Sequence, residues 1–302
     1  MNRVDICINI IQFIKSYISD PFNLKQYHEK KHFSRKRKLS IFQVIMFLLY
    51  SSKASLSCNL SCIRDDLQTL SFPTISKQAF SKARQHIHPS LFETLFQTSV
   101  TMFYSQIPSR KTWNGYHVFA IDGSKFELPN SKSNFDFFGC MSTHSNPNRK
   151  FTMALASMLY DVLDDYIIHA SMNPYLALER ECAREHLAKL KEFRFGKKCI
   201  LIFDRGYYSE GMFRYCVDNS FLCVMRLKEG INFSKRCTGD SIEILPGNPK
   251  KDIPDLRVRI IQVILDNGTK EYLATNIFKK KFSPAMFKEL YFKRHQIGRA
   301  HV

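Results

Sequence analysis

The sequence contains no apolar run long enough to cross a lipid bilayer. Its longest run, from Ile41 to Tyr50, includes Gln43 and falls well short of the roughly 20 apolar residues that a membrane-spanning helix needs. The N-terminus also lacks the layout of a secretory signal peptide, because Asp5 interrupts it before any clean apolar core. We therefore predict neither a membrane-spanning segment nor a secretory signal.

A disulfide framework, internal repeats and low-complexity segments are also missing from the chain. The nine cysteines are scattered and odd in number, which indicates reduced thiols in a cytoplasmic protein rather than a secreted disulfide scaffold. A zinc site is one alternative, and its candidate ligands are Cys58, Cys62, His86 and His88. Their spacing matches no standard zinc finger. The preferred interpretation is therefore that the two cysteines are small residues packed in a helical domain.

Acidic residues are scarce relative to basic ones. The 302 residues include 27 Asp and Glu against 45 Lys and Arg, which gives a formal net charge of +18 and a pI near 9.5. Such an excess favours a polyanionic partner, but charge alone leaves DNA, RNA and an anionic membrane surface open. Apolar residues make up 44% of the chain, so we expect a packed globular core and not global disorder.

The pattern of residues 1–112 predicts a helical N-terminal region that binds DNA. Its strongest signal is a basic run, which is typical of a phosphate-binding segment. The basic residues of this run are Lys30, Lys31, Arg35, Lys36, Arg37 and Lys38. A capped amphipathic helix from Thr74 to His88 carries further basic side chains. Two interpretations of that helix stay open: it lies in a DNA groove, or it presents a solvated face.

The pattern changes to strands from residue 113 onward. The predicted order is strand, hairpin, helix, strand, helix, strand, which indicates an α/β (α+β) fold with a mixed sheet flanked by helices. A second β-rich segment spans about 228–281 and contains a hairpin turned by Asp266-Asn267-Gly268. The last predicted element is a helix with Ser283 as its N-cap and Pro284 in its first position.

Two aspartates stand at the ends of two apolar runs, each followed by a predicted glycine turn. Asp122 closes the run that begins at Tyr116, and Asp204 closes the run that begins at Lys198. Either acid alone could simply start a turn. Placing a carboxylate at the end of a buried strand costs solvation free energy. Two such placements therefore indicate that the carboxylates have a function. Carboxylates delivered from neighbouring strand ends can hold divalent metal ions, which serve in phosphodiester cleavage and joining.

Three short motifs give the chain a family resemblance. Ala120-Ile-Asp122-Gly-Ser, Asp204-Arg-Gly-Tyr and Tyr291-x-x-Arg294 resemble the motifs of DDE transposases of bacterial insertion sequences. The chain is similar to their "IS-four" group, whose third motif reads Tyr-x2-Arg-x3-Glu-x6-Lys. The resemblance covers nearly the whole chain. It implies a ribonuclease H-like catalytic domain over residues 113–302, with the β-rich segment as an insertion.

The resemblance also implies a site and a reaction. Asp122 and Asp204 would be catalytic residues and would bind two Mg²⁺ (or Mn²⁺) ions. Tyr291 and Arg294 would contact the DNA end near the cleaved phosphate. The protein would cut and join double-stranded DNA at terminal inverted repeats and in target DNA, as a homodimer on paired ends. Two alternatives stay open: a metal-dependent nuclease of the same fold, and a non-catalytic DNA-binding protein.

The third motif departs from the family pattern at its carboxylate. Tyr291, Arg294 and position 298 are spaced i, i+3 and i+7, so a continuous helix would present all three on one face. Gly298 stands where the motif has Glu. Glu289 is no substitute, because it would face the opposite side of that helix. We therefore expect little or no strand transfer by the 302-residue chain.

The residues after Gln296 also look foreign to the family. The motif's Lys would fall beyond Val302. The codons ATC GGA AGA GCA CAC GTC would encode Ile297–Val302, and that string resembles a common sequencing-library adapter. We therefore expect that the natural reading frame is lost at about Gln296 and that the chain is truncated inside its third motif. Amplification of this junction from the source DNA tests the expectation, and recovery of the same codons followed by a stop would contradict it.

Overall fold

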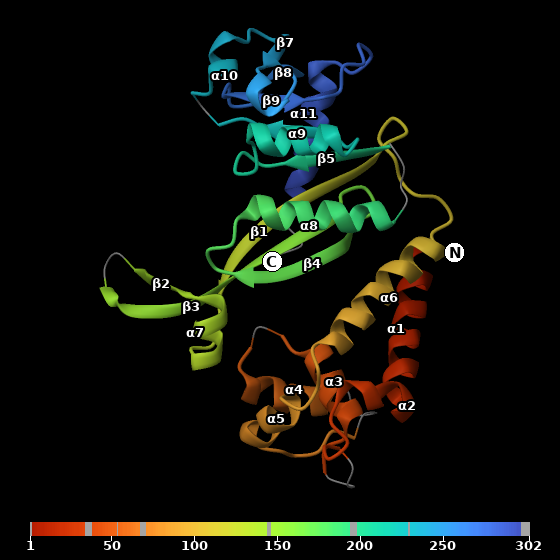
Figure 1. The fold of residues 1–302 in the computed structure, drawn as a ribbon. Coiled ribbons are helices and arrows are strands. Elements are labelled where there is room, and N and C mark those ends of the chain that lie inside the picture. Colours follow the sequence, from red (N-terminus) through yellow and green to blue (C-terminus); the bar gives the residue numbers. More distant parts are fainter. Residues whose placement is uncertain are drawn as a thin grey trace. The chain divides into compact units, whose positions relative to one another are not determined.

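The computed structural model of the chain describes residues 2–33, 38–52, 54–66, 71–143, 146–193, 198–228 and 230–296 (Figure 1). The chain divides into two compact units, Met1–Pro108 and Ser109–Val302. Across the described ranges, no helix is long and apolar enough to cross a membrane. All nine cysteines are free thiols.

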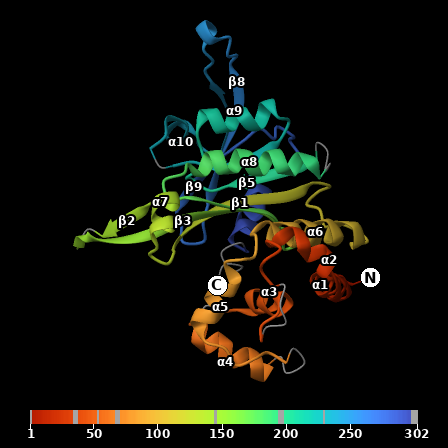
Figure 2. The same cartoon turned by 60° about the horizontal axis from the view of Figure 1, so that its bottom comes forward.

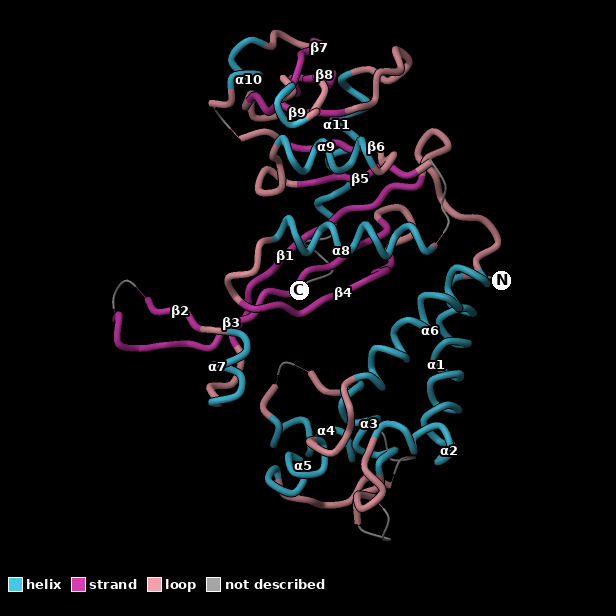
Figure 3. The backbone as a smooth tube through the Cα atoms, viewed as in Figure 1, coloured by secondary structure: helices cyan, strands magenta, loops and turns pink. Residues whose placement is uncertain are grey.

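The described part of the N-terminal unit is built from helices (Figures 1 and 3). They are α1 (Arg3–Ser19), α2 (Pro21–Leu24), α3 (Ile41–Tyr50), α4 (Leu56–Asp66), α5 (Lys77–Arg84) and α6 (Ser90–Gln106), with a 3-10 turn at Lys25–Tyr27. Each of these helices contributes buried side chains to one core, in which the ring of Phe47 contacts those of Phe72 and Phe80. The helical character that the sequence predicts for this region is confirmed.

The amphipathic helix predicted over Thr74–His88 is shorter in the structure. Ser76 accepts a hydrogen bond from the N–H of Ala79, so α5 begins directly after this cap. The helix ends at Arg84, because the N–H groups of His86 and Ile87 bond to carbonyls three rather than four residues back. The predicted helix was therefore too long at both ends.

The described residues of the second unit form one sheet of nine strands (Figures 1 and 3). The strands are β1 (His117–Glu127), β2 (Cys140–Thr143), β3 (Asn146–Asp161), β4 (Tyr166–Pro174), β5 (Cys199–Phe203), β6 (Leu222–Arg226), β7 (Asp240–Leu245), β8 (Leu256–Ile264) and β9 (Lys270–Thr275). Eight of them follow the order β2-β3-β1-β5-β6-β9-β8-β7, and the ninth, β4, pairs with β3. The first part of the long strand β3 pairs with β2, and its second part lies between β1 and β4.

The centre of the sheet has the order β4-β3-β1-β5-β6. Strands β1, β3 and β4 follow one another as antiparallel neighbours. Strand β5 then pairs in parallel with β1, and β6 pairs in parallel with β5. Each of these parallel strands is preceded by a crossover helix. Three antiparallel strands followed by two parallel ones in this order make a ribonuclease H-like sheet, so the predicted fold class is confirmed.

Helices cover both faces of this central sheet (Figures 1 and 2). The helices of the unit are α7 (Lys132–Phe138), α8 (Glu179–Glu192), α9 (Glu210–Asp218), α10 (Asn232–Arg236) and α11 (Pro284–Phe292). Helices α8 and α9 are the crossovers before β5 and β6. On the other face, Phe287 and Leu290 of α11 pack with Ala120 and Ile202 of the sheet. Ser283 caps α11 as the sequence predicts.

The β-rich segment continues the same sheet. Strand β9 pairs antiparallel with both β6 and β8, and β7 pairs with β8. The predicted hairpin is therefore present as β8 and β9. Gly268 in its turn has a φ of 82°, a conformation that glycine adopts at little cost. A second ribbon, made by β2 and the first part of β3, extends away from the centre of the sheet (Figure 2).

Candidate active site

Asp122 lies inside strand β1 and not at its end. The strand continues to Glu127 and pairs with β3 along this stretch, with Gly123 opposite Ser157. The predicted glycine turn after Asp122 was therefore wrong, because β3 supplies a partner that keeps the backbone extended. The parallel pairing of β1 with β5 stops earlier, at Ala120. Asp122 thus comes just beyond the point where β1 loses its neighbour on that side.

Asp204 directly follows the buried strand β5, as predicted. The carbonyl of Asp204 accepts a hydrogen bond from the N–H of Tyr207, which closes a turn at the strand end. Its side chain is 33% exposed, and that of Asp122 is 28% exposed. Both carboxylates are therefore shielded in part while still reaching solvent.

Arg294 joins the two aspartates. Its Nη1 lies 3.5 Å from Oδ1 of Asp122, and its Nη2 lies 3.3 Å from Oδ2 of Asp204. The arginine side chain is only 12% exposed. Tyr291, which is buried, donates a hydrogen bond from its hydroxyl to Oδ1 of Asp204 at 3.2 Å. The structure therefore brings together all four residues that the three motifs single out.

The segment that carries these last two residues differs in part from the prediction. Helix α11 ends at Phe292, and Arg294 lies in a 3-10 turn over Lys293–Gln296. The prediction of one continuous helix through Arg294 was therefore wrong. A 3-10 turn repeats every three residues, so Arg294 still lies on the same side as Tyr291. Gly298, the position of the expected third carboxylate, lies outside the described residues.

The electrostatic surroundings keep Asp204 ionised. Burial opposes ionisation, but the Arg205 backbone N–H, the Arg294 guanidinium and the Tyr291 hydroxyl outweigh it. The pKa of Asp204 is consequently lowered from its ordinary value. For Tyr291 the balance is reversed, since burial raises the pKa of its phenol. Asp204 is therefore a carboxylate acceptor at neutral pH, and Tyr291 is a donor.

Arg226 and Lys228, two basic residues that the motifs do not include, also lie at this edge of the sheet. A cavity of about 540 Å³ is lined by Asp204, Arg205, Gly206 and Lys228. Arg226 ends β6 and forms a 2.6 Å ion pair with Glu271, and its charge helps to lower the pKa of Asp204. The sequence held no local signal for either residue: the parallel pairing of β6 with β5 brings the carboxyl ends of the two strands to one edge of the sheet.

The donors at this site suit a hard divalent cation. Asp122 and Asp204 offer only carboxylate oxygens, which Mg²⁺ and Mn²⁺ prefer. The guanidinium of Arg294 contacts both carboxylates, so the two are close enough to share one positive charge. In the described part of the chain, no three His, Cys, Asp or Glu side chains converge closely enough to hold a metal ion by themselves.

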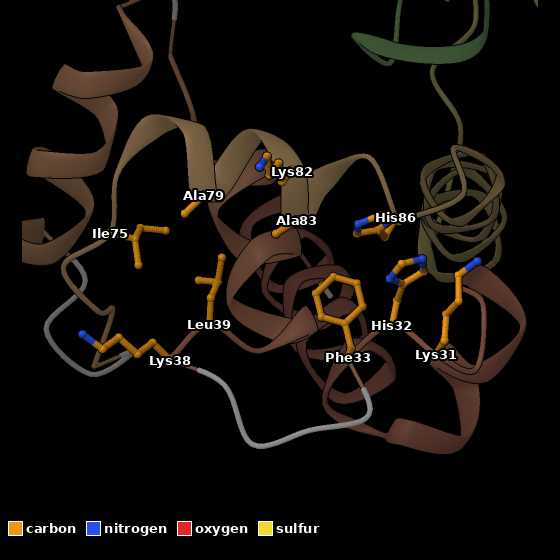
Figure 4. A pocket seen from close by; sticks show the side chains of 10 residues that line it. All are labelled: Lys31, His32, Phe33, Lys38, Leu39, Ile75, Ala79, Lys82, Ala83 and His86. Carbon is orange, nitrogen blue, oxygen red and sulfur yellow. The ribbon is translucent and has the colours of Figure 1, made fainter.

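The N-terminal unit has a basic cavity of its own, with a volume of about 380 Å³ (Figure 4). Figure 4 shows its lining: Lys31, His32, Phe33, Lys38, Leu39, Ile75, Ala79, Lys82, Ala83 and His86. The three lysines are exposed and surround a mostly apolar floor. Lys31 also pairs with Glu29 at 2.6 Å. The lining thus combines positive charge with apolar and aromatic surface.

The sequence-predicted basic run reaches this cavity in part. Lys31 and Lys38 line it, and Lys30 is exposed nearby in the chain. The remaining members of the run, Arg35, Lys36 and Arg37, lie outside the described residues. The ring of His86 stacks on that of His32, with centroids 3.5 Å apart.

The family of the chain follows from a comparison with known proteins. Residues 113–299 match the model of the transposase DDE domain family, which is more than half of the chain. The chain belongs to this family. The predicted family is therefore confirmed, and the "IS-four" subgroup stays a prediction.

Individual proteins are similar to the chain at low identity. "Putative transposase InsZ" of Escherichia coli (strain K12) is 23% identical over 138 residues, which are 46% of this chain and 44% of that protein. The chain thus spans less than half the length of this curated relative. A piggyBac transposase synaptic complex with hairpin DNA aligns at 11% identity and a TM-score of 0.47, over 96% of this chain and 67% of that chain. The NurA nuclease from Sulfolobus solfataricus aligns at 13% identity and a TM-score of 0.28, over 67% of this chain and 84% of that chain.

Proposed function

We propose that this chain is a DNA transposase of an insertion sequence, which cuts and joins DNA at the ends of its own element. The observation that carries the proposal is the convergence of Asp122 and Asp204 on Arg294 where β1 runs past β5. Membership of the transposase DDE domain family supports it. The substrates would be the terminal inverted repeats and a target duplex, and the protein would act in the cytoplasm.

In this proposal, Asp122 and Asp204 hold Mg²⁺ or Mn²⁺, two ions in the intact site. Such ions, when bound, activate the attacking oxygen and stabilise the leaving oxygen of a phosphodiester. The chain's own groups do the rest. Tyr291 fixes the orientation of Asp204 through its hydrogen bond. Arg294 lies close enough to the two carboxylates to contact the phosphate of a DNA end that is bound at this site.

We further propose that the site is incomplete at position 298. The "IS-four" motif places Glu there and the chain has Gly298. A carboxylate missing from the site would weaken cation binding and leave the leaving oxygen poorly stabilised. Cleavage and joining by the chain as it stands would therefore be close to background, and Gly298→Glu would raise both.

An assay of cleavage and joining on cognate ends in Mn²⁺ tests the function. We expect joining by the Gly298→Glu variant and none when Asp122→Asn is added to it. Asp218→Asn, which changes an exposed carboxylate at the end of α9, is the matched control and should leave the rate unchanged. Robust joining by the unaltered chain would contradict the incomplete site. Cleavage that survives Asp122→Asn would contradict the transposase.

DNA binding is assigned to the N-terminal unit in this proposal. The cavity lined by Lys31, Lys38 and Lys82 supports it, together with the rest of the basic run. The apolar and aromatic floor would accept sugar and base surface beside the contacted phosphates. The active form would be a homodimer on paired ends. Sedimentation of the chain with one and with two end fragments would test this stoichiometry.

Two rival functions make different predictions. A metal-dependent nuclease of the same fold would cut DNA and never join it, so the joining assay separates it from a transposase. A non-catalytic DNA-binding protein would keep its whole function in the Asp122→Asn, Asp204→Asn double variant. Loss of function in that variant, with DNA affinity retained, would exclude pure binding.

A further inference from the structure

A third carboxylate approaches the two aspartates from the opposite face of the sheet. Glu179 is the first residue of α8, and its side chain is half-buried. Helix α8 lies on the face of the sheet opposite to α11, the helix that Arg294 follows (Figure 1). Because β1 runs on past the end of β5, side chains from both faces can meet at this open edge.

Two glycines lie beside this carboxylate. A Cβ atom on Gly206 would lie 3.4 Å from Oε2 of Glu179, and one on Gly123 would lie 3.6 Å from its Cγ. Gly123 directly follows Asp122, and Gly206 lies in the turn after Asp204. Neither glycine has a positive φ. The side chain of Glu179 therefore lies within van der Waals reach of the backbone beside each aspartate.

The hydroxyl of Tyr207 lies in the same place. Tyr207 is 2% exposed, and its Oη would be 3.4 Å from a Cβ on Gly123. Among the residues that the structure describes, no group hydrogen-bonds this hydroxyl. Burial raises the pKa of Tyr207, and the charges of Glu179 and Asp122 raise it further, so these groups share one environment. A buried O–H normally has an acceptor, which indicates a bound water or ligand at this spot.

We propose that Glu179 is a third carboxylate of the active site, which holds the divalent cation of Asp122 and Asp204 through bound water. Tyr207 is the positioning residue, and its O–H donates to that water or to the Glu179 carboxylate. The inference rests on the proposed function, because it assigns a further group to the same cation. The role through water fits two facts: no three acidic side chains converge among the described residues, and Mg²⁺ usually keeps several of its waters.

The test is Mn²⁺ binding to the full chain, measured by titration calorimetry and by the rise in melting temperature that the metal causes. Glu179→Gln should raise the Kd for Mn²⁺ about tenfold, as for other groups that act through a ligand's hydrogen bonds. Its melting temperature without metal should match that of the unaltered chain. Glu181→Gln is the matched control, since Glu181 lies in the same first turn of α8 and pairs with Arg184 on the surface.

Asp122→Asn keeps this test separate from that of the proposed function. If the unaltered chain and Asp122→Asn both fail to bind Mn²⁺, the metal site and this inference fall together. If Asp122→Asn abolishes Mn²⁺ binding but Glu179→Gln binds Mn²⁺ as tightly as the unaltered chain, the inference about Glu179 alone is wrong. A tenfold loss in Glu179→Gln with none in Glu181→Gln supports it.

Two further variants keep the result decisive if Glu179→Gln unfolds. Glu179→Asp keeps the charge but withdraws the carboxylate by one methylene group from its place beside Gly206, and should weaken Mn²⁺ binding several-fold. Tyr207→Phe removes only the hydroxyl and should weaken it by about threefold. Unchanged Mn²⁺ affinity in both folded variants would overturn the proposal.

Discussion

The two units of the chain carry their charged residues in opposite ways. In the second unit, Asp122 and Asp204 share one nearly buried guanidinium, so each charge has a fixed partner. In the N-terminal unit, Lys31 and Lys38 of the basic run and Lys82 of α5 lie exposed around a cavity. Groups that share partners act as a unit, whereas separated charges contribute independently. The comparison therefore predicts large, non-additive effects in one unit and small, additive effects in the other.

The largest effect is expected from the aspartate pair. Asp122→Asn and Asp204→Asn should each lower the rate of DNA end cleavage by about a thousandfold or more, because either change would remove a ligand of the same cation in the proposed site. The double variant should be hardly worse than either single one. The measurement is the single-turnover cleavage rate in Mn²⁺, made in the Gly298→Glu background so that the starting rate is high. A double effect equal to the product of the single effects would show that the two aspartates act separately.

Each unit also holds a pair of contacting histidines, and the pairs differ in burial. His186 is fully buried, with its Nδ1 2.7 Å from that of His169 and its Nε2 2.9 Å from Oγ of Ser157. Burial, and then the neighbouring His169, lowers the pKa of His186 to about 3. In the N-terminal unit, His32 and His86 stack with their rings only partly covered. The buried pair should therefore make the second unit the more sensitive to acid.

Acidification tests this difference. The unfolded chain takes up a proton on His186 near pH 6.5, while the folded chain does not until about pH 3. Stability is thus present above pH 6.5 and is lost as pH falls between these values. We expect the second unit to lose on the order of a few kcal/mol between pH 7 and 4. Hydrogen exchange at these two pH values, read separately for each unit, measures the loss.

A variant assigns this loss to one residue. His186→Gln should flatten the pH dependence of the second unit, and His88→Gln, an exposed change in the N-terminal unit, should not. If both units lose stability in parallel as the pH falls, or if His186→Gln leaves the dependence unchanged, the buried histidine is not its source.

A smaller effect is expected from the guanidinium that joins the aspartates. Lysine keeps the charge but presents a single point donor, so Arg294→Lys cannot contact both carboxylates in the same way. We expect cleavage in the Gly298→Glu background to fall by about ten- to a hundredfold. Lys293→Gln is the matched control, because Lys293 pairs with Glu289 on the helix surface and not with either aspartate among the described residues. Equal rates for Arg294→Lys and the parent would mean that the charge, and not its shape, is what the site uses.

Local signals account for what the sequence predicted well. Ser283 and Pro284 mark the start of α11, and Asn267-Gly268 marks the turn between β8 and β9. Strand β5 stops just before Asp204 because the turn that contains Gly206 follows directly in the sequence. The three motifs identified the residues that meet at Arg294, although a motif does not say how they meet.

What the sequence could not supply depends on distant partners. Strand β1 continues past Asp122 because β3 pairs with it, and nothing near Asp122 specifies that pairing. Lys228 reaches the site because β6 lies next to β5. Glu179 looks like an ordinary acid in the first turn of a helix, and only the packing of α8 brings it to Gly123. These contacts became visible only with the sheet order.

The smallest effects are expected around the N-terminal cavity, and they are the sharpest check on additivity. Lys31→Gln, Lys38→Gln and Lys82→Gln should each weaken DNA binding by about two- to fivefold near 0.1 M salt. Each should also reduce the slope of log affinity against log salt by about 0.9, because each would release one counterion fewer. Fluorescence anisotropy with an end fragment at several salt concentrations measures both.

The loss of DNA affinity in the triple variant then decides whether the three lysines act independently or together. If the three lysines contact phosphates independently, the affinity of the triple variant should fall by the product of the three single-variant factors. The slope of log affinity against log salt should fall by about three times the change in a single variant. Lys15→Gln, on α1 and away from the cavity lining, is the control and should change neither quantity. A triple variant that loses far more than the product would mean that the lysines hold one DNA group together. The N-terminal cavity would then work as a unit, as the aspartate site does, and the contrast between the two units would disappear.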